Sequence, residues 1–105
     1  MSIDAYSSSP QLDDGRSDAD LISAVRDGDN DSYAVLYERH LPAAARLPSQ
    51  LLRGSDADDL VSEAFTKVLV TIQNGGGPTE SFRAYLLTSI RRLHVDRIRH
   101  VTRER

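Results

Sequence analysis

Aromatic, hydroxyl and guanidinium side chains recur at spacings of three and four residues near the end of the chain. They are Tyr85, Thr88, Ser89, Arg92, Asp96 and Arg99. Residues spaced in this way share one face of an α-helix, where we expect Asp96 to hold Arg92 and Arg99 in place. Guanidinium groups bind phosphates through charged hydrogen bonds, and an aromatic ring can stack on an exposed base. The stripe is therefore suited to nucleic acid, with a solvated helix face joined by internal salt bridges as the alternative interpretation.

Carboxylates gather on one side of a second amphipathic segment, which begins at Ser55. The apolar side consists of Ala57, Leu60, Val61, Ala64, Phe65, Val68 and Ile72, and the polar side of Asp56, Asp59, Ser62, Glu63 and Thr66. The helix dipole explains acidic residues in the first turn. It does not explain Glu63, which lies one turn from Asp59 and adds a like-charge cost of roughly a few tenths of a kcal/mol. A cationic partner from outside the chain would offset this cost.

A glycine-rich loop at residues 74–80 separates the two segments. Its glycines permit many backbone paths, and Pro78 disfavours a helical residue before it. We interpret the loop as a flexible connection between antiparallel helices, with close approach to a ligand as the alternative. The next helix is expected to begin near Ser81. Its apolar stripe is Phe82, Leu86, Ile90 and Leu93, widened by Leu87, Ile98 and Val101.

The first part of the chain predicts a tail and a short helix. Residues 1–16 contain few apolar side chains, so we expect them to be disordered. Ser17 is a suitable N-cap, and Gly28 is a suitable residue just past the end of the helix that follows.

A longer apolar helical pattern begins near Asn30 or Asp31. Pro42 and Pro48 interrupt it, which predicts either one kinked helix or two short helices. The expected fold class is therefore an all-α bundle of about four helices, with one domain at residues 17–105.

The composition excludes several protein classes. The chain of 105 residues has no cysteine, which excludes disulfides and thiolate metal sites and fits a reducing cytoplasm. No apolar run approaches the roughly 18 residues of a membrane span, and the N-terminal residues lack the pattern of a signal peptide. We therefore expect a cytoplasmic protein with no membrane partner.

Charge is distributed unevenly along the chain. The net charge is −3, yet residues 1–80 carry six basic and fourteen acidic side chains, whereas residues 81–105 carry seven arginines and two acidic residues. A concentrated basic end can bind a polyanion locally although the whole protein is acidic.

No motif typical of catalysis is present. The loop lacks the Lys-Ser/Thr of a phosphate-binding P-loop, and no nucleophile with an orienting base is evident. The three histidines, His40, His94 and His100, are scattered, so surface or rim positions are expected for them. We predict no enzyme activity, no cofactor and no metal site.

Three segments together resemble region two of bacterial sigma factors of the extracytoplasmic-function group. They read DADLISAVRDGDNDSYAVLYERHL, DADDLVSEAFTKVL and FRAYLLTSIRRLHVDRIR, in this order and at the family's spacing. The resemblance covers about residues 18–101. It implies an all-helical transcription initiation factor domain that binds core RNA polymerase and recognises and melts the minus-ten promoter element.

The resemblance also implies where the partners bind. The beta prime clamp helices of the polymerase would contact the segment that begins at Ser55, and our candidates there are Asp58, Asp59, Ser62, Glu63 and Thr66. The loop and the last helix would bind the single-stranded non-template promoter strand, and the loop would accept a flipped base. The candidates for DNA are Asn74, Thr79, Glu80, Arg83, Tyr85, Arg91, Arg92, Arg97 and Arg99. An anti-sigma factor that covers both surfaces is a further implied partner.

The sequence departs from the family at several points. Arg91-Arg92 stands where many members have Arg-Asn, Leu69 replaces a common Trp, and Pro48 falls where members continue a helix. The family's second DNA-binding domain, a helix-turn-helix, is absent from this sequence, so we interpret the chain as an excised domain, with a protein that works with one domain as the alternative. Two alternative functions are a helical protein-interaction adaptor without DNA binding and a regulator that reads duplex DNA.

Overall fold

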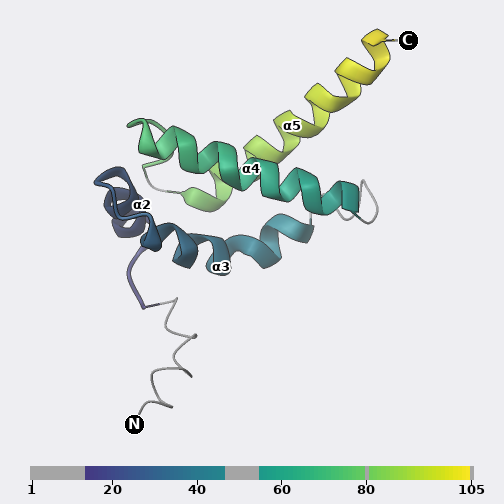
Figure 1. Cartoon of the computed structure of the whole chain (residues 1–105). Helices are drawn as coiled ribbons and strands as arrows, with labels where there is room; N and C mark the ends of the chain where they lie inside the picture. Colours follow the sequence, from purple (N-terminus) through teal and green to yellow (C-terminus); the bar gives the residue numbers. More distant parts are fainter. Residues whose placement is uncertain (1–13, 47–54, 80, 105) are drawn as a thin grey trace.

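The computed structural model describes residues 14–46, 55–79 and 81–104. Within these ranges the chain forms four helices and no strand: α2 (Asp18–Arg26), α3 (Asp31–Arg46), α4 (Ser55–Gln73) and α5 (Phe82–Glu104) (Figure 1). The expected all-α fold of about four helices is confirmed. Most of the predicted tail lies outside the described residues, and so does Pro48.

Local chemistry sets both ends of α2. The Ser17 hydroxyl accepts a hydrogen bond from the Asp20 N–H at 3.1 Å, which makes it the predicted N-cap. At the other end Gly28 has a φ of +105°, and its N–H donates to the Val25 carbonyl at 3.0 Å. The Asp29 N–H donates to the Ala24 carbonyl at 2.9 Å. These two bonds form a Schellman motif, which requires a left-handed residue such as glycine.

The end of α4 has the same design. Gly75 has a φ of +93°, and its N–H donates to the Ile72 carbonyl at 2.9 Å. The Gly76 N–H donates to the Thr71 carbonyl at 2.9 Å. The first glycines of the loop therefore end the helix in a defined conformation. After the loop, the Ser81 hydroxyl accepts from the Ala84 N–H at 3.2 Å and caps α5.

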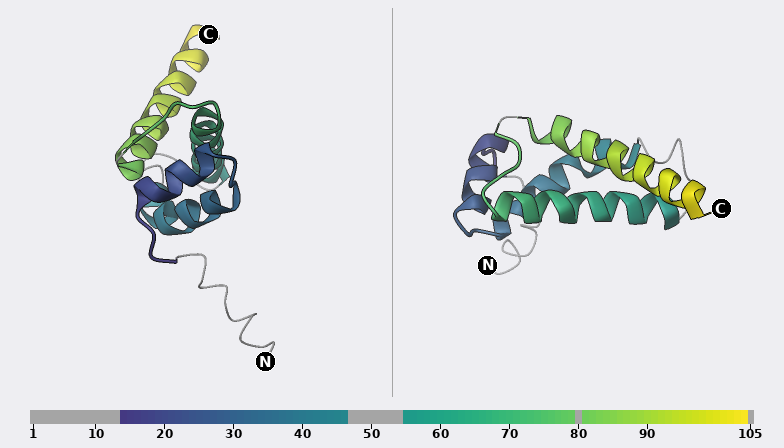
Figure 2. Two further views of the ribbon diagram at one scale, coloured as in Figure 1. Left: turned by 90° about the vertical axis from the view of Figure 1, so that its left-hand side faces the viewer. Right: turned by 90° about the horizontal axis from the view of Figure 1, so that it is seen from above.

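Three aromatic rings join the three longer helices at the centre of the core. Tyr33 of α3 lies edge-on to Phe65 of α4 and to Phe82 of α5, with ring centroids 6.4 and 5.9 Å away. The Tyr33 hydroxyl donates to the Phe65 carbonyl at 2.6 Å. Figure 2 shows α2 across one end of the longer helices, which it seals with the buried side chains of Leu21, Ile22 and Val25.

Helix α3 continues through Pro42 to Arg46, so Pro42 does not divide it, and a division at Pro48 would lie outside the described residues. Pro42 removes the donor that would bind the Glu38 carbonyl. Both residues are exposed, so water can bind that carbonyl. The apolar pattern continues past the proline, where Ala44 is fully buried.

Only the first half of α5 is packed into the bundle. Phe82, Leu86, Ile90 and Leu93 are buried as expected, but Ile98 is 51% exposed. The prediction that Ile98 widens the apolar stripe is wrong, because α5 extends past the other helices (Figure 1). None of the helices, as far as the chain is described, is long and apolar enough to cross a membrane.

Candidate functional site

The loop and α5 together border one surface hollow of about 490 Å³. Its lining residues, which we call the loop–helix hollow, are Pro78, Thr79, Ser81, Ala84, Tyr85, Thr88, Ser89 and Arg92. Tyr85 is 37% exposed, and Arg92 is also exposed. The hollow therefore combines an aromatic ring, hydroxyl groups and a guanidinium, all accessible from solvent.

A groove between α4 and α5 continues from this hollow. Tyr85, Ser89 and Arg92 line both, and α4 contributes Lys67 and Thr71 to the groove. Lys67 was missed among the predicted DNA-binding residues. A helical wheel places it beside the apolar side of α4, but only the packing of α4 on α5 brings it next to the Tyr85 stripe.

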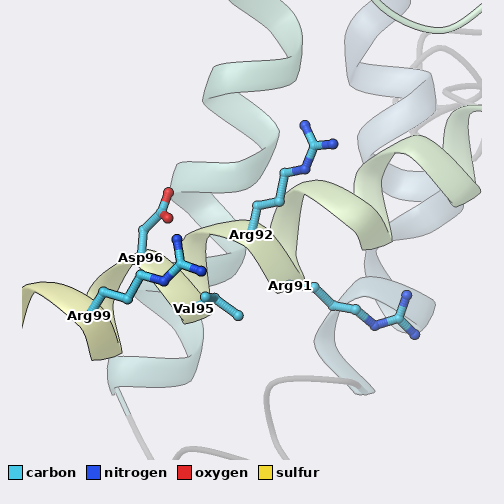
Figure 3. Close-up of a pocket in the computed structure, with 5 residues that line it drawn as sticks. All are labelled: Arg91, Arg92, Val95, Asp96 and Arg99. Carbon is cyan, nitrogen blue, oxygen red and sulfur yellow. The ribbon is translucent and has the colours of Figure 1, made fainter.

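Figure 3 shows how the arginines of the middle of α5 are directed. Arg91 and Arg92 point away from each other, and Asp96 and Arg99 lie further along the helix with Val95 beside them. Within the described part of the chain, Asp96 forms no ion pair with Arg92 or Arg99. The expected bracing of these two guanidinium groups by Asp96 is therefore not found, and both remain exposed.

Two other predicted DNA-binding arginines are directed toward groups of the bundle. The Arg83 Nε donates to His40 Nδ1 of α3 at 3.3 Å. Arg97 Nη2 lies 2.6 Å from Glu63 Oε1 of α4. The structure thus brings Thr79, Tyr85 and Arg92 together and does not bring Arg83 or Arg97 into their hollow.

The glycine loop is held by specific contacts. Arg26 Nη2 of α2 donates to the carbonyls of Gly76 and Pro78 at 2.7 and 3.2 Å. Gly77 has a φ of +88°, and a Cβ there would lie 3.0 Å from Ile72 Cγ1. Helix packing and α2 thus determine the path of the loop in this structure, whereas its flexibility stays a prediction. Glu80 lies outside the described residues.

The remaining loop candidate, Asn74, lies away from the hollow. Its N–H donates to the Val70 carbonyl at 3.0 Å, so it belongs to the end of α4. Asn74 is exposed but is not among the residues of the loop–helix hollow.

The polymerase candidates on α4 are accessible. Asp58, Asp59, Ser62 and Thr66 are exposed, and Glu63 is half-buried because Arg97 covers it. We call these five residues the acidic face. Glu63 pairs with Arg97 of the same chain and not with the outside cation that was expected from the sequence. Among the described residues Asp59 has no ion pair, so an outside cation stays a prediction for Asp59. Val70, 47% exposed, extends this side of α4 and was not predicted.

His40 is 4% exposed, so the expected surface or rim position is wrong for this histidine. His40 Nε2 lies 2.8 Å from Asp18 Oδ2, and Asp18 also binds Arg39 at 2.9 Å. Burial lowers the pKa of His40 below its usual value, against the opposing effect of Asp18. Because Nδ1 accepts from Arg83, a neutral ring with its proton on Nε2 satisfies both contacts. His40 thus joins α2, α3 and α5.

Comparison with known proteins identifies the family to which the chain belongs. An accessible groove that combines basic and aromatic side chains is suited to binding a polyanion. The model of one family, sigma-70 region 2, matches residues 36–104. The chain belongs to this family. No curated protein and no solved structure matched the chain significantly.

Membership defines the general role of the chain. Region 2 of a sigma factor is a transcription-factor domain that binds core RNA polymerase and recognises the minus-ten promoter element. It does not belong to a known enzyme family. The resemblance found in the sequence is thereby confirmed for the family. The assignment to the extracytoplasmic-function group stays a prediction.

Proposed function

We propose that this domain helps to melt the minus-ten element by accepting a base of the non-template strand in the loop–helix hollow. Extruding a base costs about a few kcal/mol of stacking and pairing energy. Stacking on an aromatic ring returns about 1–3 kcal/mol, and arginine contacts to phosphate add to this. Tyr85 and Arg92 supply these two interactions next to the hydroxyls of Thr79, Thr88 and Ser89.

The single observation that carries this proposal is that residues of the loop and of α5 line the same hollow. A base could be enclosed between Thr79 and Tyr85 while its phosphates lie along Arg92 and Arg99. Arg91 points away from Arg92 and would contribute only to the general positive field (Figure 3).

The acidic face is the proposed contact for the beta prime clamp helices. Asp59, Ser62 and Thr66 form its centre by helical periodicity, and Asp58 and Glu63 form its edges. Exposed carboxylates favour a cationic partner and accelerate its association. In this proposal the protein belongs to the extracytoplasmic-function group, acts in the cytoplasm with the polymerase, and is controlled by an anti-sigma factor that covers both surfaces.

The test uses a single-stranded DNA selected from a random pool for binding to this protein in complex with core RNA polymerase. Tyr85→Ala and Arg92→Ala should each weaken binding of this DNA about tenfold, the scale of one stacking or phosphate contact. Arg91→Ala, the matched arginine on the other side, should weaken it less. Affinity should fall steeply with added salt.

Three results would contradict the proposal. If no DNA is selected although the polymerase binds, the domain is a protein-interaction adaptor. If any duplex binds equally well, it reads double-stranded DNA. If Arg91→Ala and Arg92→Ala have the same effect, the hollow is not the site.

A further inference from the structure

We propose that Arg26 of α2 is a positioning residue that holds the glycine loop in the conformation able to receive the base, an inference that depends on the proposed function. Arg26 lies 50 residues before Gly76 in the sequence. Its Nη2 donates to the Gly76 carbonyl at 2.7 Å and to the Pro78 carbonyl at 3.2 Å. One nitrogen therefore links two carbonyls on either side of Gly77.

The two bonds fix the part of the loop that leads directly into the hollow. Pro78 is buried, accepts from Arg26 through its carbonyl and also lines the loop–helix hollow. Thr79, the next residue, is exposed and lines the same hollow. Arg26 itself is not a lining residue, so it acts on the hollow only through the loop backbone.

A guanidinium at this place has a cost that packing alone does not explain. The Nε of Arg26 is buried and has no hydrogen-bond partner among the described residues. A buried donor without a partner is unfavourable. An aliphatic side chain would fill the same space without that cost. What the guanidinium provides in addition is the pair of hydrogen bonds to the Gly76 and Pro78 carbonyls.

A second tie acts at the same end of the bundle. Gln73 Nε2, at the end of α4, donates to Asn30 Oδ1 in the turn between α2 and α3 at 3.1 Å. The α4 terminus and the loop are thus both attached to residues 26–30. These residues precede the segment that matches the family model, which begins at residue 36. In this proposal α2 and the turn after it therefore help to fix the loop that lines the loop–helix hollow.

Preorganisation predicts a definite effect on binding. If the loop spends a smaller fraction of time in the receptive conformation, the apparent affinity for DNA falls in proportion to that fraction. We expect Arg26→Met to weaken binding of the selected single-stranded DNA about tenfold and to leave polymerase binding unchanged. Arg16→Met is the matched control, since Arg16 pairs with Asp14 and, among the described residues, forms no hydrogen bond or ion pair with the loop. It should bind DNA as the wild type does.

An abasic scan separates positioning from general structural damage. Each base of the selected DNA is removed in turn, and the wild-type complex should lose about tenfold or more in affinity at the one flipped position. In Arg26→Met this loss should shrink at that position and stay unchanged at the others. The amide of Gly76, which donates to the Thr71 carbonyl at 2.9 Å, should also exchange hydrogen faster. Arg26→Lys keeps the positive charge on a single ammonium group. Its loss of affinity at the flipped position should lie between those of the wild type and Arg26→Met.

The outcomes are distinguishable. If Arg26→Met shows the wild-type abasic pattern, or weakens every position equally, Arg26 does not position the loop. If Arg26→Met does not fold, the same scan on Arg26→Lys decides in the same way. If the wild type shows no position-dependent loss, and Tyr85→Ala and Arg92→Ala bind normally, then the proposed function itself has failed.

Discussion

Reversing the charge of Asp59 should weaken binding to core RNA polymerase about 5- to 30-fold. Asp59 is exposed on the acidic face and, within the described residues, has no ion pair to lose. An exposed ion pair contributes about 0.2–1 kcal/mol. Repulsion between like charges about 4 Å apart in water adds about 1 kcal/mol. Asp59→Arg should therefore cost about 1–2 kcal/mol of binding free energy.

Glu63, one turn away, should respond differently. Its carboxylate already contacts Arg97 at 2.6 Å, with side-chain exposures of 43% and 39%. A polymerase cation must replace Arg97, so the net gain at Glu63 is smaller than at Asp59. Glu63→Gln should weaken polymerase binding less than Asp59→Asn. Loss of this exposed pair should lower the free energy of unfolding by at most about 1 kcal/mol, or roughly 4–8 °C in Tm.

The assay is a titration of core RNA polymerase with fluorescently labelled protein at two salt concentrations. Asp31→Arg is the control, because Asp31 is an exposed aspartate in the first turn of α3 and changes the net charge equally. Equal weakening by Asp31→Arg and Asp59→Arg would mean that total charge, and not the acidic face, governs binding. A larger effect at Glu63 than at Asp59 would refute the competition with Arg97.

The remaining predictions concern the loop, the buried histidine and promoter opening. Gly77→Ala should reduce stability by about 1–2 kcal/mol because of its positive φ, whereas Gly76→Ala should change it little; equal Tm values would contradict this. Because burial lowers the pKa of His40, the unfolded chain binds its proton more readily, so stability should fall as pH drops below about 6.5. His40→Gln should lose less Tm between pH 7 and pH 5 than the wild type does, and equal losses would refute the assignment. Arg92→Ala should reduce open-complex formation more than polymerase binding; a parallel loss would make Arg92 structural.

Local signals in the sequence were sufficient for most helix ends. The helix ends at Ser17 and Gly28 depend on residues within a few positions of one another. The same is true of the core stripe from Phe82 to Leu93. Such features follow from capping chemistry and helical periodicity, which need no knowledge of the fold.

The failures concern features that depend on the neighbouring helices. A break at Pro42 was one of the expected alternatives, but the helix continues because this proline lies on the exposed side. Ile98 has the periodicity of a core residue, yet it is exposed, because within the described residues no other helix covers this part of α5. His40 has no local signal for burial, because Asp18, Arg83 and Phe82 come from other helices.

The same limit applies to the candidate site. The stripe from Tyr85 to Arg99 is visible in the sequence because it lies on one helix. The contacts of Arg26 with the loop and of Lys67 with the groove join separate helices. Their existence depends on crossing angles and on the path of the loop, which periodicity does not determine.

The pair formed by Arg97 and Glu63 means that the two proposed surfaces are not independent. Arg97 belongs to the basic helix α5, and Glu63 lies at the edge of the acidic face of α4. A cation that binds Glu63 competes with Arg97, and a phosphate that binds Arg97 competes with Glu63. Binding of either ligand breaks the ion pair and so favours binding of the other. By linkage, each ligand raises the affinity for the other by the same factor. If both surfaces bind as proposed, this single ion pair between α4 and α5 links polymerase binding to promoter binding.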